Sequence, residues 1–476
     1  MNHPTPAERA PEIVAGPALV CGLGAAIAMW VAAWITHLPG LALPGPVSGP
    51  VVLATWGLAA VCLGRRVPAT QAIKVGLGAG LITAVVGLLI LGSLLTEQPA
   101  GGEPAPGASG LRPRAVIAAG GFLVAGACIG LVGTLTGARL AAAPPGPPAP
   151  LPAPDLWLAR LAAVTCVAFA PLLITGGAVT GTNSGMAIRG WPGSAGANMF
   201  LYPVSLMVSD PQRFLEHSHR LFGTLVGLST LVLMVRTLLT RSAPSRARTL
   251  APILFALVCV QGVVGGLRVL EDSRHAALLH GIVAQVVFAL AVWLAVVLSP
   301  AWRGIPTTGL ALERGPRFAR LATALLHATL VQLVLGASFR HLKLIGSAGA
   351  LHALYAHAAL ALVVVGLAML VGFWAAHLGP RHADPDPSQG PRRALTRLGR
   401  ALVAVVALQF LLGLLAFAVV MTDAPAGAPA PVDAGAGRIG GVPALRAALT
   451  TAHQANGALV LGVATMLWAL LRRAAR

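Results

Sequence analysis

Twelve long apolar runs dominate this chain and constrain its fold more than any other feature. Most of them reach about 20 residues, the length that an α-helix needs to cross the hydrocarbon core of a bilayer. Backbone polar groups in lipid must bond within their own segment, so each run is expected to be helical. The sequence therefore predicts an all-α integral membrane protein with about 12 transmembrane helices. The runs lie at roughly 13–36, 49–64, 74–95, 115–137, 159–179, 216–235, 250–268, 276–298, 320–339, 350–374, 400–421 and 449–471.

The composition agrees with this interpretation. Only 10% of the residues are charged and the mean hydropathy is +0.81, whereas soluble proteins carry about 25% charged residues. A soluble enzyme and a disordered chain are therefore excluded. The five cysteines all lie in apolar stretches, without the spacing of a metal site or a loop disulfide.

The formal charge of +19 comes from 33 Lys and Arg against 14 Asp and Glu. When the N-terminus is placed inside, 22 of the 33 basic residues fall in the segments on the cytoplasmic side. This alternation follows the positive-inside rule and predicts cytoplasmic N- and C-termini in the cell (plasma) membrane. The charge thus indicates topology, and nucleic acid is not an expected partner.

A Pro-rich stretch at 140–155 cannot continue a helix and separates the first four spans from the last eight. We therefore predict a four-helix N-terminal extension at 1–150 and an eight-helix domain at 151–476. The first four spans are rich in small residues that suit helix packing and carry no residues for chemistry. A second low-complexity loop, at 424–443, is expected on the outer side.

Histidines stand near the predicted outer ends of alternate helices. His219, His280 and His453 begin the sixth, eighth and twelfth spans, and His352 and His357 begin the tenth. His352 and His357 lie about 140° apart around a helix, so they cannot serve one face equally. We prefer His357 because it lies deeper in the span, and His352 remains the alternative. The other histidines, among them His217 and His341, look peripheral.

Spans five to eight and nine to twelve share a weak common plan. The run Gln261-Gly-Val-Val-Gly265 resembles Gln409-Phe-Leu-Leu-Gly413, and His280 then matches His453. This duplication predicts two four-helix bundles, each with two histidines on facing helices. A bundle interior can hold a cofactor, and two imidazoles on opposite sides of an iron give six-coordinate heme.

The two predicted sites differ in one carboxylate. Glu216 lies three residues before His219, so both project from one face of the helix, whereas Leu354 takes that place before His357. A carboxylate beside a heme can take part in proton chemistry. A site without one suits a permanent redox heme.

Several motifs together resemble the heme A synthase family, over residues 156–473. They are Gly177-Ala-Val-Thr-Gly-Thr-Asn-Ser-Gly-Met-Ala187, Trp191-Pro192, Glu216-His-Ser-His219, Gln261-Gly-Val-Val-Gly-Gly-Leu-Arg268 and His453-Gln-Ala-Asn-Gly457. The resemblance implies an eight-helix, pseudo-twofold fold and oxidation of a heme O ring methyl to a formyl group, which gives heme A for cytochrome oxidase. It also implies a heme b cofactor. Heme O synthase (a farnesyltransferase) and cytochrome oxidase assembly factors are the implied partners, and a homo-oligomer is a further expectation.

Roles carried over from the family follow the matching positions. The resemblance implies Glu216 as the catalytic carboxylate, His219 and His280 at the substrate heme, His357 and His453 as ligands of the heme b iron, and Arg220 and Arg268 as partners of heme propionates. The chain departs from the family pattern at Gly190, where an acidic residue is common, and at Ala358, where a basic residue is common. It also has no cysteine pair in the outer loop after span five.

Two other functions compete with this one. A b-type cytochrome or quinol oxidoreductase would hold heme without modifying it, and Glu216 beside one histidine pair favours the enzyme. A transporter would place polar residues near the membrane midplane on broken helices. Here they gather at helix ends, which argues against transport.

Overall fold

A computed structural model describes residues 6–96, 111–141, 154–344, 346–378, 389–421, 438–439 and 442–475. In these residues the chain is all-α except for one two-residue strand pair, and 12 helices are long and apolar enough to span a membrane. The predicted fold class and the number of spans are confirmed, and the chain is a multi-pass membrane protein. The relation of the two predicted bundles by a pseudo-twofold axis stays a prediction.

The helices extend beyond the apolar runs because polar side chains stabilise their ends. Helix α7 covers Pro211–Leu239, and the Asp210 carboxylate before it accepts a hydrogen bond of 2.8 Å from the backbone N–H of Gln212. Helix α9 covers Arg274–Leu298, and the Ser273 hydroxyl accepts from the N–H of Ala276 at 3.2 Å. Such caps satisfy donors that the helix itself leaves open.

The chain forms two compact units, here called unit 1 and unit 2. Unit 1 comprises Met1–Pro171 and Gly185–Ser242, and unit 2 comprises Leu172–Ser184 and Ala243–Arg476. The division falls within helix α5, Pro154–Gly181, at its internal Pro171. The boundary expected near residue 150 lies outside the described residues and stays a prediction, and most of the 424–443 loop also lies outside them.

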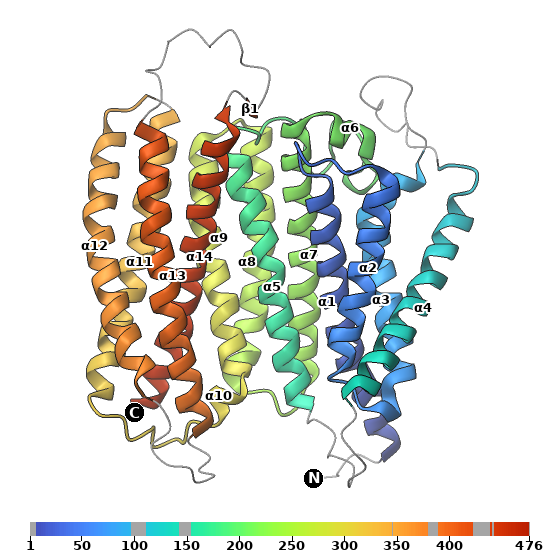
Figure 1. Ribbon diagram of the computed structural model, residues 1–476, viewed down its shortest axis with the longest axis horizontal. Helices are drawn as coiled ribbons and strands as arrows, with labels where there is room; N and C mark the ends of the chain where they lie inside the picture. The colour runs from blue at the N-terminus through green and yellow to red at the C-terminus, as the bar shows by residue number, and fades with distance from the viewer. Residues whose placement is uncertain are drawn as a thin grey trace. The chain divides into compact units, whose positions relative to one another are not determined.

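In unit 1, α1 packs on α2 and α3, and α4 packs on the same two helices; they are the blue and cyan helices of Figure 1. The long loop between α5 and α6 contains the 3₁₀ helix Met199–Leu201. Two further 3₁₀ turns, Ala69–Gln71 and Gly92–Leu95, flank α3. The α-helices that lie wholly in this unit are α1 Pro6–Thr36, α2 Gly45–Gly64, α3 Ala72–Leu91, α4 Ala115–Ala141, α6 Val204–Ser209 and α7 Pro211–Leu239.

Glycines bring the backbones of α3 and α4 into contact. A Cβ added at Gly130 would lie 2.5 Å from the carbonyl oxygen of Gly76, and one added at Gly80 would overlap the carbonyl oxygen of Gly126. The glycines repeat every four residues, which places them on one face of each helix. The small residues that the sequence shows in the first four spans therefore form a close helix–helix contact.

Replacing Gly130 with leucine is expected to destabilise unit 1. The obstacles are backbone atoms that cannot rotate away, and overpacking of this kind costs about 1–3 kcal/mol. Thermal unfolding of the purified protein in detergent measures the loss. Gly120→Leu on the same helix is the control, because nothing lies within 4 Å of a Cβ at Gly120. Equal melting temperatures for the two variants would contradict the close α3–α4 contact.

Unit 2 contains a closed ring of four helices in which α11 packs on α12, α12 on α13, α13 on α14 and α14 on α11. Helices α8 and α9 pack on each other, and α9 also packs on α14 and α11. The orange and red helices in Figure 1 belong to this ring. Spans nine to twelve thus form a four-helix bundle. The elements of unit 2 are α8 Ser245–Leu270, α9 Arg274–Leu298, α10 Pro300–Arg303, α11 Gly315–Leu344, α12 Gly349–Ala376, α13 Gln389–Met421, β1 Arg438–Ile439, β2 Val442–Pro443 and α14 Ala444–Ala474.

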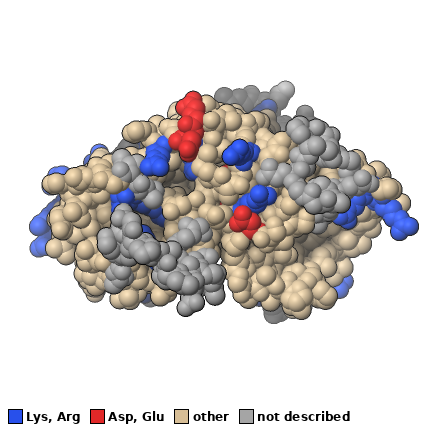
Figure 2. Space-filling model, turned by 90° about the horizontal axis from the view of Figure 1, so that it is seen from above, with Lys and Arg blue, Asp and Glu red and all other residues tan. Residues whose placement is uncertain are grey.

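The exterior of the helices is apolar, as lipid contact requires. On α13, for example, Leu411, Leu414 and Phe417 are exposed although all are large and hydrophobic. Figure 2 views the molecule from above, where most of the visible described surface carries no charged residue, with scattered Lys and Arg and fewer Asp and Glu. Each of the five cysteines is free, in agreement with the sequence.

Candidate functional site

Two of the predicted histidines meet in unit 2. The rings of His357, on α12, and His453, on α14, have centroids 6.2 Å apart and planes inclined by 74°. His352, on the same helix as His357, is exposed. Of the two candidates on α12, the structure therefore brings His357 and not His352 to His453.

Three histidines of unit 2 fit against glycines of neighbouring helices. Each glycine lies where any larger residue would meet the imidazole ring, so its missing side chain makes room for the histidine. A Cβ at the glycine would come within 2.9, 2.9 and 3.2 Å of the ring Cε1 in the pairs Gly265–His280, Gly336–His357 and Gly413–His453. This histidine–glycine contact, here called a glycine seat, occurs at three places, in agreement with the duplicated pattern seen in the sequence.

A glutamine four residues before each of these glycines contacts the same histidine. The Nδ1 of His357 lies 3.0 Å from the backbone carbonyl oxygen of Gln332, and the Gln332 side-chain amide donates to the carbonyl of His357 at 2.8 Å. His280 lies beside the backbone of Gln261. A ring whose Nδ1–H donates to a carbonyl keeps the lone pair of Nε2 for a metal, which is the usual arrangement of a ligating histidine.

A row of hydrogen-bonded polar side chains lies beside His453. The side-chain amide nitrogen of Gln409 lies 3.1 Å from Nδ1 of His453. Asn456, which is buried, donates to Gln409 Oε1 at 2.8 Å and to the carbonyl of Val405 at 2.9 Å. The His-Gln-Ala-Asn-Gly motif at 453–457 therefore contains both the histidine and the residue that fixes its glutamine partner.

The His357–His453 pair fits a heme iron. With metal–nitrogen bonds of about 2 Å, two imidazoles on opposite sides of an iron have ring centroids about 6 Å apart, which is close to the 6.2 Å seen. Among the described residues no group of three or more His, Cys, Asp or Glu could hold a metal ion. Heme needs only two protein ligands, since the porphyrin supplies the other four.

The second predicted pair, His219 and His280, is divided between the units. His219, on α7, belongs to unit 1 and is partly buried; His280 and Arg268 belong to unit 2 and are partly buried as well. The pairing of these two histidines around a substrate stays a prediction.

Glu216 and Arg220 form a buried ion pair on α7 in unit 1. The Arg220 Nη2 donates to Glu216 Oε1 at 2.7 Å, and the side chains are 9% and 4% exposed, respectively. The second carboxylate oxygen of Glu216 accepts from the backbone N–H of Ile188 at 2.8 Å. Each oxygen of a carboxylate has a further acceptor position, so Glu216 can still bind a proton donor.

Arg220 also fastens the loop that follows α5. Its guanidinium donates to the carbonyls of Ile188, Gly190 and Gly193 at 2.8, 2.9 and 3.0 Å. Gly190 has φ of +85°, a conformation that suits glycine better than the acidic residue common in the family. Arg220 therefore positions both Glu216 and the loop, and its role toward a propionate stays a prediction.

His217 is not peripheral, contrary to the sequence interpretation. It is 3% exposed, and its ring lies 4.9 Å from that of Tyr202 at an angle of 41°. Its Nδ1 is buried without a hydrogen-bond partner among the described residues. Neighbouring positions on a helix point in different directions, and only the fold shows that the loop bearing Tyr202 covers this one.

Arginines also gather at the end of unit 2 where the histidines lie, and the sequence did not predict this grouping. Arg340 on α11 lies 3.4 Å from the Gln454 side-chain oxygen and 3.5 Å from the carbonyl of Gly177. Its charge interacts with that of Arg446. The positive charges of Arg340 and Arg268 both interact with the imidazole of His341. The position of Arg340 in an apolar span was the signal that could have revealed it.

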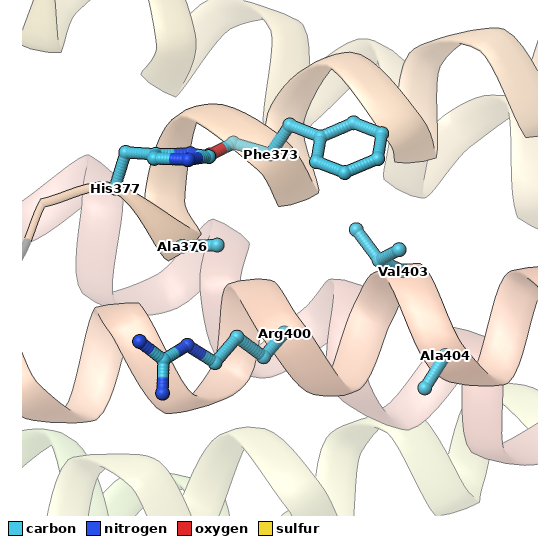
Figure 3. Close-up of a pocket in the computed structure, with 6 residues that line it drawn as sticks. All are labelled: Phe373, Ala376, His377, Arg400, Val403 and Ala404. Carbon is cyan, nitrogen blue, oxygen red and sulfur yellow. The ribbon is translucent and has the colours of Figure 1, made fainter.

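A cavity of about 430 Å³ lies between α12 and α13 and is separate from the histidine pair. Figure 3 shows His377 and Arg400 on its wall, with Phe373 and Val403 beside them. His377 is 20 residues after His357, or about 30 Å along a helix. This cavity therefore belongs to the other end of the bundle.

The comparison with known families agrees with the motifs. Residues 159–353 match the model of the COX15-CtaA family, described as cytochrome oxidase assembly protein. No curated protein and no solved structure matches the chain. The matched segment contains Glu216, His219 and His280, and it ends just before His357. Residues 159–353 are thus similar to the COX15-CtaA family of cytochrome oxidase assembly proteins, in agreement with the heme A synthase resemblance that the motifs indicated.

Proposed function

We propose that this protein oxidises a ring methyl of heme O to a formyl group and so supplies heme A for cytochrome oxidase. The family match supports a role in cytochrome oxidase assembly. The observation that carries the proposal further is the His357–His453 pair, whose 6.2 Å separation and glycine seats suit a heme iron. The proposed activity would belong to the predicted eight-helix domain, residues 151–476.

In this proposal His357 and His453 hold a permanent heme b. Bound there, the heme would supply electron transfer. Gln332 orients the His357 ring through its backbone carbonyl, and the side-chain amide of Gln409 lies beside both ring nitrogens of His453. Arg340, beside Gln454, would offer its guanidinium to a heme propionate, as Arg suits carboxylates.

The proposed substrate site uses His219 and His280 to flank heme O and Arg268, with Arg220, to hold its propionates. In two successive two-electron oxidations, water would supply both oxygen atoms and an external electron acceptor would take the four electrons, which converts the methyl carbon to a geminal diol and releases four protons. Loss of one water then leaves the aldehyde. Glu216 would bind the proton that moves as this water leaves. Arg220 keeps the Glu216 carboxylate in one orientation through the 2.7 Å ion pair, and such positioning is a large part of acid–base catalysis.

Location and partners follow from the same proposal. The plasma membrane is the proposed location, and the distribution of basic residues supports cytoplasmic termini, which would put the heme-binding ends toward the outer side. Heme O synthase, the farnesyltransferase that makes the substrate, and cytochrome oxidase assembly factors are the proposed partners. A homo-oligomer is proposed as well.

The direct test is expression of the protein in cells that make heme O but no heme A. Extracted hemes are then separated and their masses measured. Heme A in cells with the protein, and none in cells without it, supports the proposal. If the purified protein holds heme b tightly while heme O stays unchanged, the function is that of a b-type cytochrome or quinol oxidoreductase.

Replacing Gly336 with alanine is expected to weaken the heme b site. The added methyl would lie 2.9 Å from Cε1 of His357, so the ring must shift from its present position opposite His453. We expect a loss of heme of about tenfold, as for other changes that disturb ligand orientation. Absorption spectra of the purified variant measure it. Gly366→Ala, on α12, has no atom within 4 Å of its new Cβ and should keep a full heme content; similar spectra for both variants would argue against the glycine seat.

A further inference from the structure

A cavity of about 590 Å³ opens at the end of unit 2 where α8 and α11 begin and α9 and α14 end. It lies at the opposite end of α14 from His453, since its lining includes Arg472 and Arg473 near the end of that helix. It is therefore separate from the proposed heme sites.

Four arginines converge on this cavity from three helices. Arg246 comes from α8, Arg320 from α11, and Arg472 and Arg473 from α14. None of the described lining residues is acidic. The nearest acidic residue along the chain, Glu313, is 76% exposed and lies 3.9 Å from Arg314 instead. The cavity thus concentrates positive charge without a carboxylate of its own.

Three tryptophans contribute large apolar surfaces to its wall, beside a proline and three alanines. Trp293 and Trp468 meet edge to face with centroids 5.5 Å apart. Trp302 is only 7% exposed, and the guanidinium carbons of Arg473 and Arg246 lie 4.8 and 5.7 Å from its ring centroid. The guanidinium of Arg473 also donates to the carbonyl of Ile305 at 3.1 Å. Trp302 therefore helps to orient two of the arginines.

We propose that this cavity binds the phosphate-bearing headgroup of an anionic phospholipid. Arginine pairs well with phosphate oxygens, and basic pockets between transmembrane helices bind such headgroups. Tryptophan favours the boundary between headgroups and acyl chains, where one side is apolar and the other wet. A soluble phosphate would use the arginines but gain nothing from the apolar wall. In the orientation that the basic loops predict, the cavity faces the cytoplasmic leaflet.

The test uses the full-length protein in nanodiscs that contain equal amounts of phosphatidylglycerol and phosphatidylcholine. Native mass spectrometry then counts the lipids that remain bound. The test variant replaces Arg246, Arg320 and Arg472 with glutamine, and Arg473 is kept because it bonds to Ile305. The control variant replaces Arg317, Arg393 and Arg397 with glutamine. These three arginines are exposed near the starts of α11 and α13, and they do not line the cavity. Both variants lose the same charge.

We expect the wild type and the control to retain phosphatidylglycerol and the test variant to bind it at least about tenfold more weakly. Unchanged thermal unfolding of the lipid-free test variant shows that its fold is intact. The proposal is overturned if test and control variants lose the lipid equally, or if phosphatidylcholine is retained as well as phosphatidylglycerol. It is also overturned if glycerol phosphate or inorganic phosphate at equal concentration displaces the lipid.

Discussion

Replacing His453 with alanine is expected to remove the heme b spectrum of the purified protein. His453 and His357 face each other at 6.2 Å, and loss of one imidazole leaves the iron with one protein ligand. Since even changes next to a ligand cost about 10–100-fold in metal affinity, we expect heme content to fall at least tenfold. The absorption bands of six-coordinate bis-histidine heme should disappear from whatever heme remains. Absorption spectroscopy with extraction of the heme measures both effects.

Two further variants make this test specific to the ligand pair. His357→Ala should give the same loss, because either ligand is needed for six-coordination. His352→Ala is the matched control, since His352 is exposed on the same helix, and its spectrum should equal that of the wild type. If instead His352→Ala abolishes the spectrum and His357→Ala does not, the ligand on α12 has been chosen wrongly.

Replacing Glu216 with glutamine is expected to reduce heme A formation by about 100-fold or more, because acid–base groups contribute at least that much. The heme b spectrum should be retained, since its proposed ligands lie on α12 and α14 of the other unit. The loop after α5 should also stay in place. Arg220 still donates to the carbonyls of Ile188, Gly190 and Gly193 when the carboxylate is lost. Mass analysis of hemes from cells supplied with heme O gives the rate, and the spectrum gives the state of the protein.

The control for this variant removes another carboxylate of the same helix. Asp210 caps the N-terminus of α7, and its side chain is 43% exposed. Asp210→Asn should therefore alter heme A formation by less than about twofold. Glu216→Gln keeps a side-chain oxygen that can accept from Arg220, so a purely structural Glu216 predicts near-normal heme A formation by this variant, whereas a catalytic Glu216 predicts the loss stated above. Normal heme A formation by Glu216→Gln rules out the catalytic assignment.

The membrane fold could be predicted from the sequence because its cause is local. A span of about 20 apolar residues must be helical in lipid whatever lies beside it, and all twelve predicted runs correspond to helices. The positions of the helix ends were harder to predict from the sequence. Hydropathy stops at the first polar residues, whereas caps such as Asp210 and Ser273 let the helices continue into them.

The candidate site could be predicted in part. The spacing of the histidines and the duplicated Gln-x-x-x-Gly pattern identified the residues, since a histidine in an apolar span is costly and stands out. The choice between His352 and His357 depended on which side of α12 faces α14. The arrangement of Arg220 depended on a loop 30 residues away in the chain, at Gly190.

By itself, the sequence determined that this chain crosses a membrane, how many helices do so, and which polar residues are exceptional within them, because hydropathy and charge act residue by residue. Only the tertiary structure decided which of those residues meet. Packing set His357 against His453, engaged Arg220 with Glu216 and the Gly190 loop, and buried His217. The physical reason is that helix rotation and loop path are fixed by contacts between distant segments, which no single stretch of sequence contains.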